Sequence, residues 1–187
     1  MAEAITYLLV DGENIDATLG VNVLGRRPNP DERPRWERVR DFARDAWEQP
    51  VKPLFFLNAS SGQLPMSFVQ ALLTLDYRPI PLAGRTSEKV VDLGIQRMLD
   101  AIEQHGGDVV LASHDADFVP HITRLADAGR RVGLLGFREF VSSRFTDLTM
   151  TGRLELFDLE DHVGAFSSVL PRVRIIPIED FDPARYL

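Results

Sequence analysis

The chain of 187 residues contains no cysteine. This absence excludes a disulfide framework, a thiolate zinc site and a cysteine nucleophile, and it fits a protein of the reducing cytoplasm. The chain also has no apolar run near the roughly 20 residues that span a bilayer. Its first residues, MAEAITYLLVDGEN, lack the basic region of a signal peptide. We therefore expect a cytoplasmic protein with no membrane partner.

Positive charge is scarce as well. The 28 acidic residues outnumber the 21 lysines and arginines and give a formal net charge of -7. Such a balance disfavours non-specific binding to nucleic acid, because phosphates are attracted by positive potential. The arginines nevertheless concentrate between Arg26 and Arg44, so local binding of phosphate stays open.

Short apolar runs alternate with amphipathic segments along the chain. With 44% hydrophobic residues, the chain can bury a core and fits a single domain. We expect a turn at residues 12–15 and a long proline-containing loop at residues 20–34. Strands alternating with helices imply a doubly wound α/β sheet. The strands are expected at residues 5–10, 51–57, 78–82, 109–112, 132–135 and 154–159, and the helices at 35–48, 65–75, 89–105, 118–128 and about 138–145.

The most informative stretch is DVVLASHDADF, residues 108–118. Its four apolar residues read as a strand buried on both faces. Two carboxylates one residue apart, Asp115 and Asp117, follow where that strand ends. Binding sites of doubly wound sheets form outside the carboxyl ends of the strands, and charges crowded there are costly unless a cation or proton neutralises them. The stretch therefore predicts one wall of a metal site.

Two more aspartates are expected at the same edge of the sheet. Asp11 ends the first strand, and Asp92 lies in the first turn of the helix at residues 89–105. Taken singly, each carboxylate could be a strand-exit turn, a helix cap or a complement to a helix N-terminus. Caps do not explain three or four carboxylates converging, so we favour a metal site. Oxygen ligands alone favour Mg²⁺ or Mn²⁺ over zinc, and these ions support phosphodiester hydrolysis.

Three segments carry a family resemblance: VDGENI at residues 10–15, KVVDLG at 89–94 and LASHDADFVPHITRLADAGRRV at 111–132. In this order and spacing they resemble the NYN domain family of the PIN-like nuclease superfamily, especially its bacterial LabA-like branch. The resemblance covers residues 5–137. It implies a Rossmann-like three-layer α/β/α sandwich with a mainly parallel sheet in the order 3-2-1-4-5. We assign residues 1–150 to this domain and expect residues 151–187 to form a C-terminal extension packed on it.

The resemblance also implies Mg²⁺- or Mn²⁺-dependent cleavage of RNA. Asp11, Asp92, Asp115 and Asp117 match the acidic positions of the family, which are both its metal ligands and its catalytic residues. Asn14 matches the asparagine that follows the first aspartate, and Ser113 matches a small hydroxyl residue. We expect Asp115 to be a direct ligand and Asp117 an outer ligand or a helix cap.

Two positions depart from the family pattern. His114 stands where the family usually has glycine; it could crowd the site, bind phosphate when protonated, or point to solvent, and we favour solvent because an unperturbed histidine is mostly neutral at pH 7. Met98 stands where the family often has another aspartate. Asp100 is no substitute, since it lies roughly 12 Å down the helix from Asp92.

Basic residues near these segments are the candidates for substrate contacts. Lys89 is the best placed, because it precedes Asp92 at the helix start and could meet a phosphate. Arginines on the helix after residue 35 are more simply a solvated face. The predicted substrate-binding residues are Asn14, Ser113, His114, Lys89, Arg85, Arg26 and Arg27.

The sequence thus predicts a metal-dependent endoribonuclease in which one or two Mg²⁺ or Mn²⁺ ions activate water. The alternative is a non-catalytic domain of the same fold that binds RNA or protein, which the departures at His114 and Met98 and the negative charge favour. A phosphatase is disfavoured, because Asp11 is followed by Gly12 and Glu13 and not by a second aspartate. It is left open whether residues 153–187 extend the sheet, pair subunits into a homodimer or shield the site.

Overall fold

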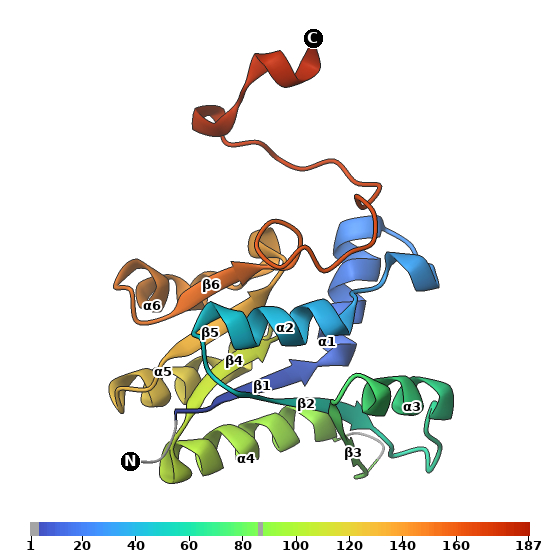
Figure 1. Ribbon diagram of the computed structural model, residues 1–187, viewed down its shortest axis with the longest axis vertical. Helices are drawn as coiled ribbons and strands as arrows, with labels where there is room; N and C mark the ends of the chain where they lie inside the picture. Colours follow the sequence, from blue (N-terminus) through green and yellow to red (C-terminus); the bar gives the residue numbers. More distant parts are fainter. Residues whose placement is uncertain (1–3, 86–87) are drawn as a thin grey trace.

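The computed structural model describes residues 4–85 and 88–187. Within them, six strands form one sheet in which every neighbouring pair is parallel, in the order β3-β2-β1-β4-β5-β6 (Figure 1). The expected order 3-2-1-4-5 is confirmed, and β6 continues the sheet beyond β5. The strands are β1 (Thr6–Asp11), β2 (Val51–Asn58), β3 (Arg78–Leu82), β4 (Asp108–Ala112), β5 (Val132–Gly136) and β6 (Glu155–Asp158).

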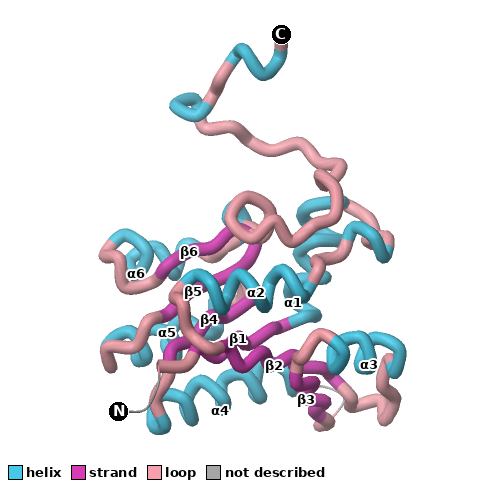
Figure 2. Tube along the Cα trace, viewed as in Figure 1, coloured by secondary structure: helices cyan, strands magenta, loops and turns pink. Residues whose placement is uncertain are grey.

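Helices cover both faces of the sheet, as expected for three layers (Figure 2). One face packs on α1 (Gly12–Ala17), α2 (Trp36–Ala46) and α3 (Met66–Thr74). The other packs on α4 (Val90–His105), α5 (Val119–Asp127) and α6 (Thr146–Met150). None of the helices in the described part of the chain is long and apolar enough to cross a membrane.

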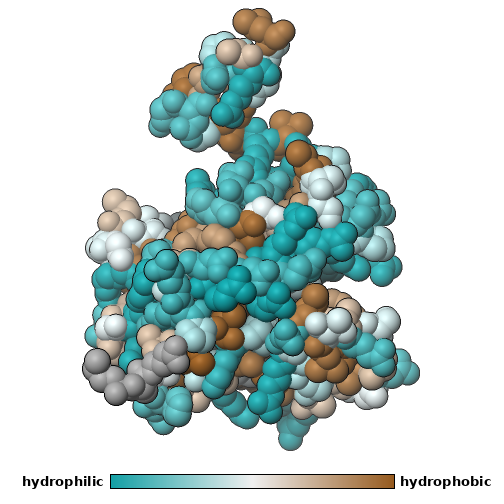
Figure 3. Space-filling model, viewed as in Figure 1, coloured by the Kyte–Doolittle hydropathy of each residue, from teal (hydrophilic) through white to brown (hydrophobic). Residues whose placement is uncertain are grey.

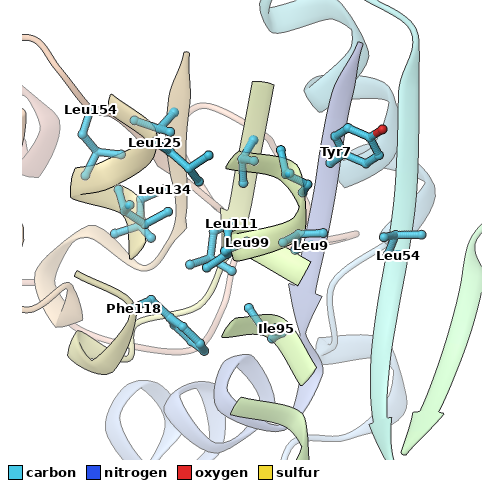
Figure 4. Packing of buried hydrophobic residues seen from close by; sticks show 14 of the residues in the cluster. Tyr7, Leu9, Leu54, Ile95, Leu99, Leu111, Phe118, Leu125, Leu134 and Leu154 are labelled. Carbon is cyan, nitrogen blue, oxygen red and sulfur yellow. The ribbon is translucent and has the colours of Figure 1, made fainter. Parts of the chain in front are cut away.

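The core is divided between the two faces because side chains alternate along each strand. In β1, Leu8 and Val10 contact the α1–α3 layer, whereas Leu9 contacts the α4–α6 layer. Figure 4 shows Leu9 and Leu111 of adjacent strands close to the helical residue Leu99. Burial on both faces explains why these strands are continuous apolar runs in the sequence.

The segment after β1 differs from its prediction. The turn expected at residues 12–15 is the helix α1, and the start of the loop expected at 20–34 is a π-helical segment, Thr18–Leu24. The reason is tertiary: Ile15, Leu19 and Val23 are spaced four apart and all are buried on the sheet. The turn and loop predictions were wrong here. They followed the glycines and prolines of this segment, whereas the burial of the three apolar side chains on the sheet decides its structure.

The prediction of a helix at about residues 138–145 was also wrong. The chain forms two short 3₁₀ turns, Arg138–Phe140 and Ser143–Phe145, before α6. Arg138 donates its N–H to the Asp158 carboxylate, 3.0 Å away, and the Ser142 hydroxyl accepts the N–H of Arg144. The Ser142 side chain therefore takes up a backbone N–H that a continuous helix would use, and the Asp158 carboxylate holds the first residue of the segment against the end of β6.

The C-terminal extension divides into two parts. Residues up to 172 lie on the domain: β6 joins the sheet, and Leu159, Ala165 and Leu170 are buried on the α2 face. Arg174 still pairs with Glu160 and Asp161 of the domain, and the residues after it leave the body of the molecule (Figure 1). The expected packing of the extension on the domain therefore extends only as far as Arg174. Pro177 and Pro183 interrupt this segment, and its described backbone hydrogen bonds are local turns, which leaves the segment without a sheet partner.

Two leucines on different helices test this division of core and surface. Leu99 on α4 is 1% exposed, and Leu73 on α3 is 57% exposed. Leu99→Ala should lower the free energy of unfolding by about 2–5 kcal/mol, because it removes buried contacts and leaves a cavity. Leu73→Ala is the matched control and should change it by about 0.5 kcal/mol or less. Urea unfolding measures both, and equal losses would contradict the packing described.

Candidate metal centre

Three carboxylates converge where the strands end. Asp92, in the first turn of α4, and Asp115 and Asp117, after β4, each offer an oxygen within 4.8 Å of the other two. A divalent cation bound 2.0–2.6 Å from each oxygen holds opposite ligands roughly 4–5 Å apart. The three side chains are therefore close enough to hold one ion with little adjustment.

Asp11 forms the buried back wall of this cluster. It is the last residue of β1 and only 2% exposed. Its Oδ2 accepts the Ser113 hydroxyl at 2.9 Å, and its Oδ1 accepts the Asn14 N–H at 3.3 Å. Burial raises the pKa of Asp11 to about 6. The two hydrogen bonds lower the pKa, and the negative charges of Asp92 and Asp115 raise it further. Asp11 is thus beside the three-oxygen group and not within it.

Asp92 also experiences uncompensated negative charge. Burial and the charge of Asp115 raise its pKa, and the exposed Glu13 adds to the effect. Lys89 opposes it, with its Nζ 3.8 Å from an Asp92 oxygen. A single lysine at this distance leaves the cluster negative, so a cation would stabilise it.

Asp115 is both a cluster member and a cap. Its Oδ1 accepts the N–H of Asp117 at 2.9 Å at the start of the 3₁₀ turn Ala116–Phe118. Of the two roles expected for Asp117, outer ligand or helix cap, the cap is wrong, because Asp115 precedes the turn and caps it. The carboxylate of Asp117 is exposed and faces the cluster.

His114 does not point to solvent, so that prediction was wrong. Its ring is buried, and Nε2 accepts the N–H of Phe137 at 2.7 Å. Nδ1 consequently carries the proton and donates it to Asn14 Oδ1, 2.9 Å away. The ring fits because residue 136 is glycine: a Cβ there would lie 2.6 Å from His114 Nε2.

This histidine fixes the side chain of Asn14. The Asn14 Oδ1 accepts both the His114 ring N–H and the His114 backbone N–H, the latter at 2.8 Å. Both lone pairs of the amide oxygen are then used, and the NH₂ group is the part of Asn14 that can donate to a ligand. Asn14 lines the pocket beside the carboxylates, so His114 acts on the site through it.

A pocket of about 340 Å³ lies in front of Asp11 and Asp92. Sequence reasoning missed three of its polar residues, Glu13, Asn58 and Glu88. Asn58 is the last residue of β2, so the strand-end rule that selected Asp11 could have found it. Glu88 accepts the Arg85 N–H at 2.8 Å, and only the folded turn shows that contact.

The predicted basic residues are only partly brought to this pocket. Lys89 lines it, and Arg85 lies four residues earlier and is exposed. Arg26 instead forms a two-pronged ion pair with Glu32, with distances of 2.6 and 2.7 Å. That contact lowers the pKa of Glu32 to about 2. It also connects the two ends of the loop that follows the π-helical segment. Arg26 and Arg27 are not among the residues that line the pocket.

Comparison with known proteins agrees with this geometry. The chain matches the NYN domain family over residues 5–150. It belongs to this family. NYN domains are part of the PIN-like nuclease superfamily, as the segments around Asp11, Asp92 and Asp115 predict. No curated protein matches the chain. A crystal structure of a Vibrio parahaemolyticus protein of unknown function is similar in fold, with a TM-score of 0.66 and 17% identity over 86% of this chain and 96% of that one.

The donor atoms of this NYN domain fit a divalent cation. The cluster consists of carboxylate oxygens, which hard cations prefer. Burial raises the pKa values of Asp11 and Asp92, and the negative charges of neighbouring aspartates add to the effect, so a bound cation would stabilise the ionised carboxylates. The residues present therefore suit a metal ion.

The proton on His114 gives a direct test of the site's geometry. Burial lowers the pKa of His114 to about 4, against an opposing effect of Asp158. In the metal-free NYN domain, the imidazole ¹⁵N signals of His114 should show an Nδ1–H tautomer and stay unchanged between about pH 8 and pH 5. Gly136→Ala should displace the ring and move its titration toward the ordinary value of about 6.5. A wild-type midpoint near that ordinary value would contradict the buried position.

Asp11 should make stability depend on pH. Its pKa is 3.8 in an unfolded chain and about 6 in the folded one, so the folded state binds this proton more tightly. The free energy of unfolding of the metal-free domain should therefore fall as pH rises from about 4 to above 6, by about 3 kcal/mol from this group.

Asp11→Asn removes the titrating carboxylate and should flatten this dependence. Asp100→Asn, on the part of α4 that contacts Arg124, should keep it. Urea unfolding at a series of pH values measures the slope. An identical slope in wild type and Asp11→Asn would show that Asp11 titrates normally.

Proposed function

We propose that this NYN domain is a Mg²⁺- or Mn²⁺-dependent endoribonuclease. The observation that carries the proposal is the convergence of the Asp92, Asp115 and Asp117 oxygens within 4.8 Å, beside the buried carboxylate of Asp11. Membership of a nuclease superfamily supports a phosphodiester as the substrate. The choice of RNA and the assignment to the LabA-like branch rest on the sequence resemblance.

The four aspartates have different tasks in this proposal. Asp92, Asp115 and Asp117 would hold the ion, and Asp11 would hold a water or complete the ligand set from behind. A bound divalent ion lowers the pKa of water and offsets the charge that develops on a phosphodiester. Ser113 donates to Asp11 and fixes the direction of that carboxylate.

The remaining pocket residues position the substrate. Asn14, held by His114, presents its NH₂ group as a donor to a phosphate oxygen or a water. Lys89 is 74% exposed and lies beside Asp92, where its ammonium group can pair with a phosphate. Arg85 is the next exposed cation toward the N-terminus and could contact the same substrate. Substrate binding by Arg26 and Arg27 has less support, because these residues do not line the pocket.

Asp115→Asn is the sharpest test of this site. Asparagine can still accept the N–H of Asp117 and cap the turn, so the fold should be retained. It removes a negative ligand, so cleavage of a fluorescent single-stranded or structured RNA with Mg²⁺ or Mn²⁺ should fall by at least about 100-fold. Asp100→Asn is the matched control, because Asp100 pairs with Arg124 outside the pocket.

The same experiments separate this function from the non-catalytic alternative. Cleavage at the wild-type rate by Asp115→Asn would refute the site assignment. Calorimetric titration with Mn²⁺ should show binding in wild type and weaker binding in Asp115→Asn. If wild type bound no Mn²⁺ at millimolar metal and bound RNA without cutting it, the domain would be an RNA-binding module.

A further inference from the structure

The C-terminal tail, residues 173–187, exposes a series of large apolar side chains. Val173, Ile175 and Ile178 are 97%, 98% and 82% exposed. The tail is uppermost in Figure 3, where apolar and polar groups alternate along it. Single apolar residues scattered over a surface are ordinary, but several of them within one short projecting segment are typical of a binding element.

The point where the tail leaves the domain is fixed by ion pairs. The guanidinium of Arg172 is almost fully buried and pairs with Glu139 and Glu160. Arg174 pairs with Glu160 at 2.6 Å and with Asp161 at 3.0 Å. The residues that follow project away from the body (Figure 1). This direction favours a partner other than the tail's own domain.

An apolar groove on the same chain is also without a partner in the described structure. It lies between β3 and α4, has a volume of about 540 Å³, and is lined by Phe56, Leu82, Leu93 and Met98 among others. Leu93 is 43% exposed although it faces this groove. A volume of this size lies in the range of sites that take up ligands, so it can receive more than one side chain.

The groove can be filled by side chains but not by an added strand. β3 is the edge of the sheet, and the carbonyl of its Leu82 accepts the Ala59 N–H on the β2 side. Because backbone groups alternate in direction, Pro79 and Pro81 face the open edge, where they have no N–H to donate. A partner must therefore recognise the apolar groove itself.

Charge makes the tail and the groove complementary. The tail carries the exposed acidic residues Glu179, Asp180 and Asp182 between its apolar positions. Two charged residues line the groove: Arg97 on α4, and Glu88, which also lines the candidate metal pocket. Arg78 is exposed at the start of β3. Across residues 4–85 and 88–187, neither arginine forms an ion pair with a carboxylate. The acidic residues of the tail can therefore pair with Arg97 while its apolar side chains enter the groove.

We propose that the tail of one copy docks in the β3–α4 groove of a second copy. Ile175, Ile178 and Phe181 would enter the groove, with the neighbouring acidic residues facing Arg97. Reciprocal exchange of two tails closes a twofold-symmetric dimer, in which each copy both gives and receives one segment. Glu88 and Val90 line both the groove and the candidate metal pocket, so the docked tail borders that pocket. The proposal depends on the fold alone and not on nuclease activity.

The absence of native cysteine allows a clean cross-linking test. One full-length preparation carries Ile178→Cys and another carries Leu93→Cys. After mixing and mild oxidation, a disulfide-linked dimer containing one copy of each should form, because docking brings the two positions within reach of a disulfide. Met150→Cys in place of Leu93→Cys is the matched control, since Met150 is 80% exposed on α6. The control pair should give at least about 10-fold less product.

Sedimentation equilibrium provides a second measurement on the uncross-linked full chain. Wild type should be dimeric at high micromolar concentration, and Leu93→Asp and Arg97→Glu should each weaken the dimer by at least about 10-fold, with circular dichroism unchanged. Adding Asp180→Arg to Arg97→Glu should restore part of the association.

Four results would overturn the proposal: a wild-type monomer at these concentrations, a dimer indifferent to Leu93→Asp, equal cross-linking in the Met150→Cys control, or a disulfide formed within one chain that carries both Ile178→Cys and Leu93→Cys. If the tail bound only a different protein, wild type would be monomeric at these concentrations, which is the first of the four results.

Discussion

The structure depends most on the burial of negative charge where β1 and β4 end. Asp11 is nearly inaccessible to water and, among the described residues, receives only the Ser113 hydroxyl and the backbone N–H of Asn14. Asp158, at the end of β6, is equally buried, and burial alone would raise its pKa. It accepts the backbone N–H groups of Arg138, Glu160 and Asp161, which lower it instead. The fold therefore gives Asp158 three backbone donors, whereas Asp11 remains a buried carboxylate whose pKa is raised, beside three further aspartates that could hold a metal ion.

Two glycines let the core support this arrangement. A Cβ at Gly12 would lie 2.5 Å from the Phe55 ring, and a Cβ at Gly136 would lie 2.6 Å from the His114 ring. Phe55 thereby packs beneath the start of α1, and His114 reaches Asn14. The positions of Asp11 and Asn14 are thus set by rings on neighbouring strands and loops, which explains why the site needs the whole sheet to form.

The strand order could be predicted from the family resemblance, which the VDGENI and KVVDLG segments carry. The meeting of Asp92, Asp115 and Asp117 beside Asp11 could be predicted because carboxylates that follow parallel strands share one edge of the sheet. The rest depended on contacts distant in sequence. The helical course of Thr18–Leu24 follows from burial on the sheet, and the buried ring of His114 requires Gly136 and Phe137 on the next strand and loop. Arg26 was expected to bind substrate, but it forms an ion pair with Glu32. Only the folded loop brings these two residues together.

The most direct test of the metal site is the anomalous diffraction signal of a crystal soaked in Mn²⁺. We expect a peak among the carboxylates of Asp92, Asp115 and Asp117, on the side that faces Asp11. In a soaked crystal of Asp115→Asn the peak should be reduced or absent. A wild-type crystal with no peak at these carboxylates would contradict the site, and so would a peak bound elsewhere in their place.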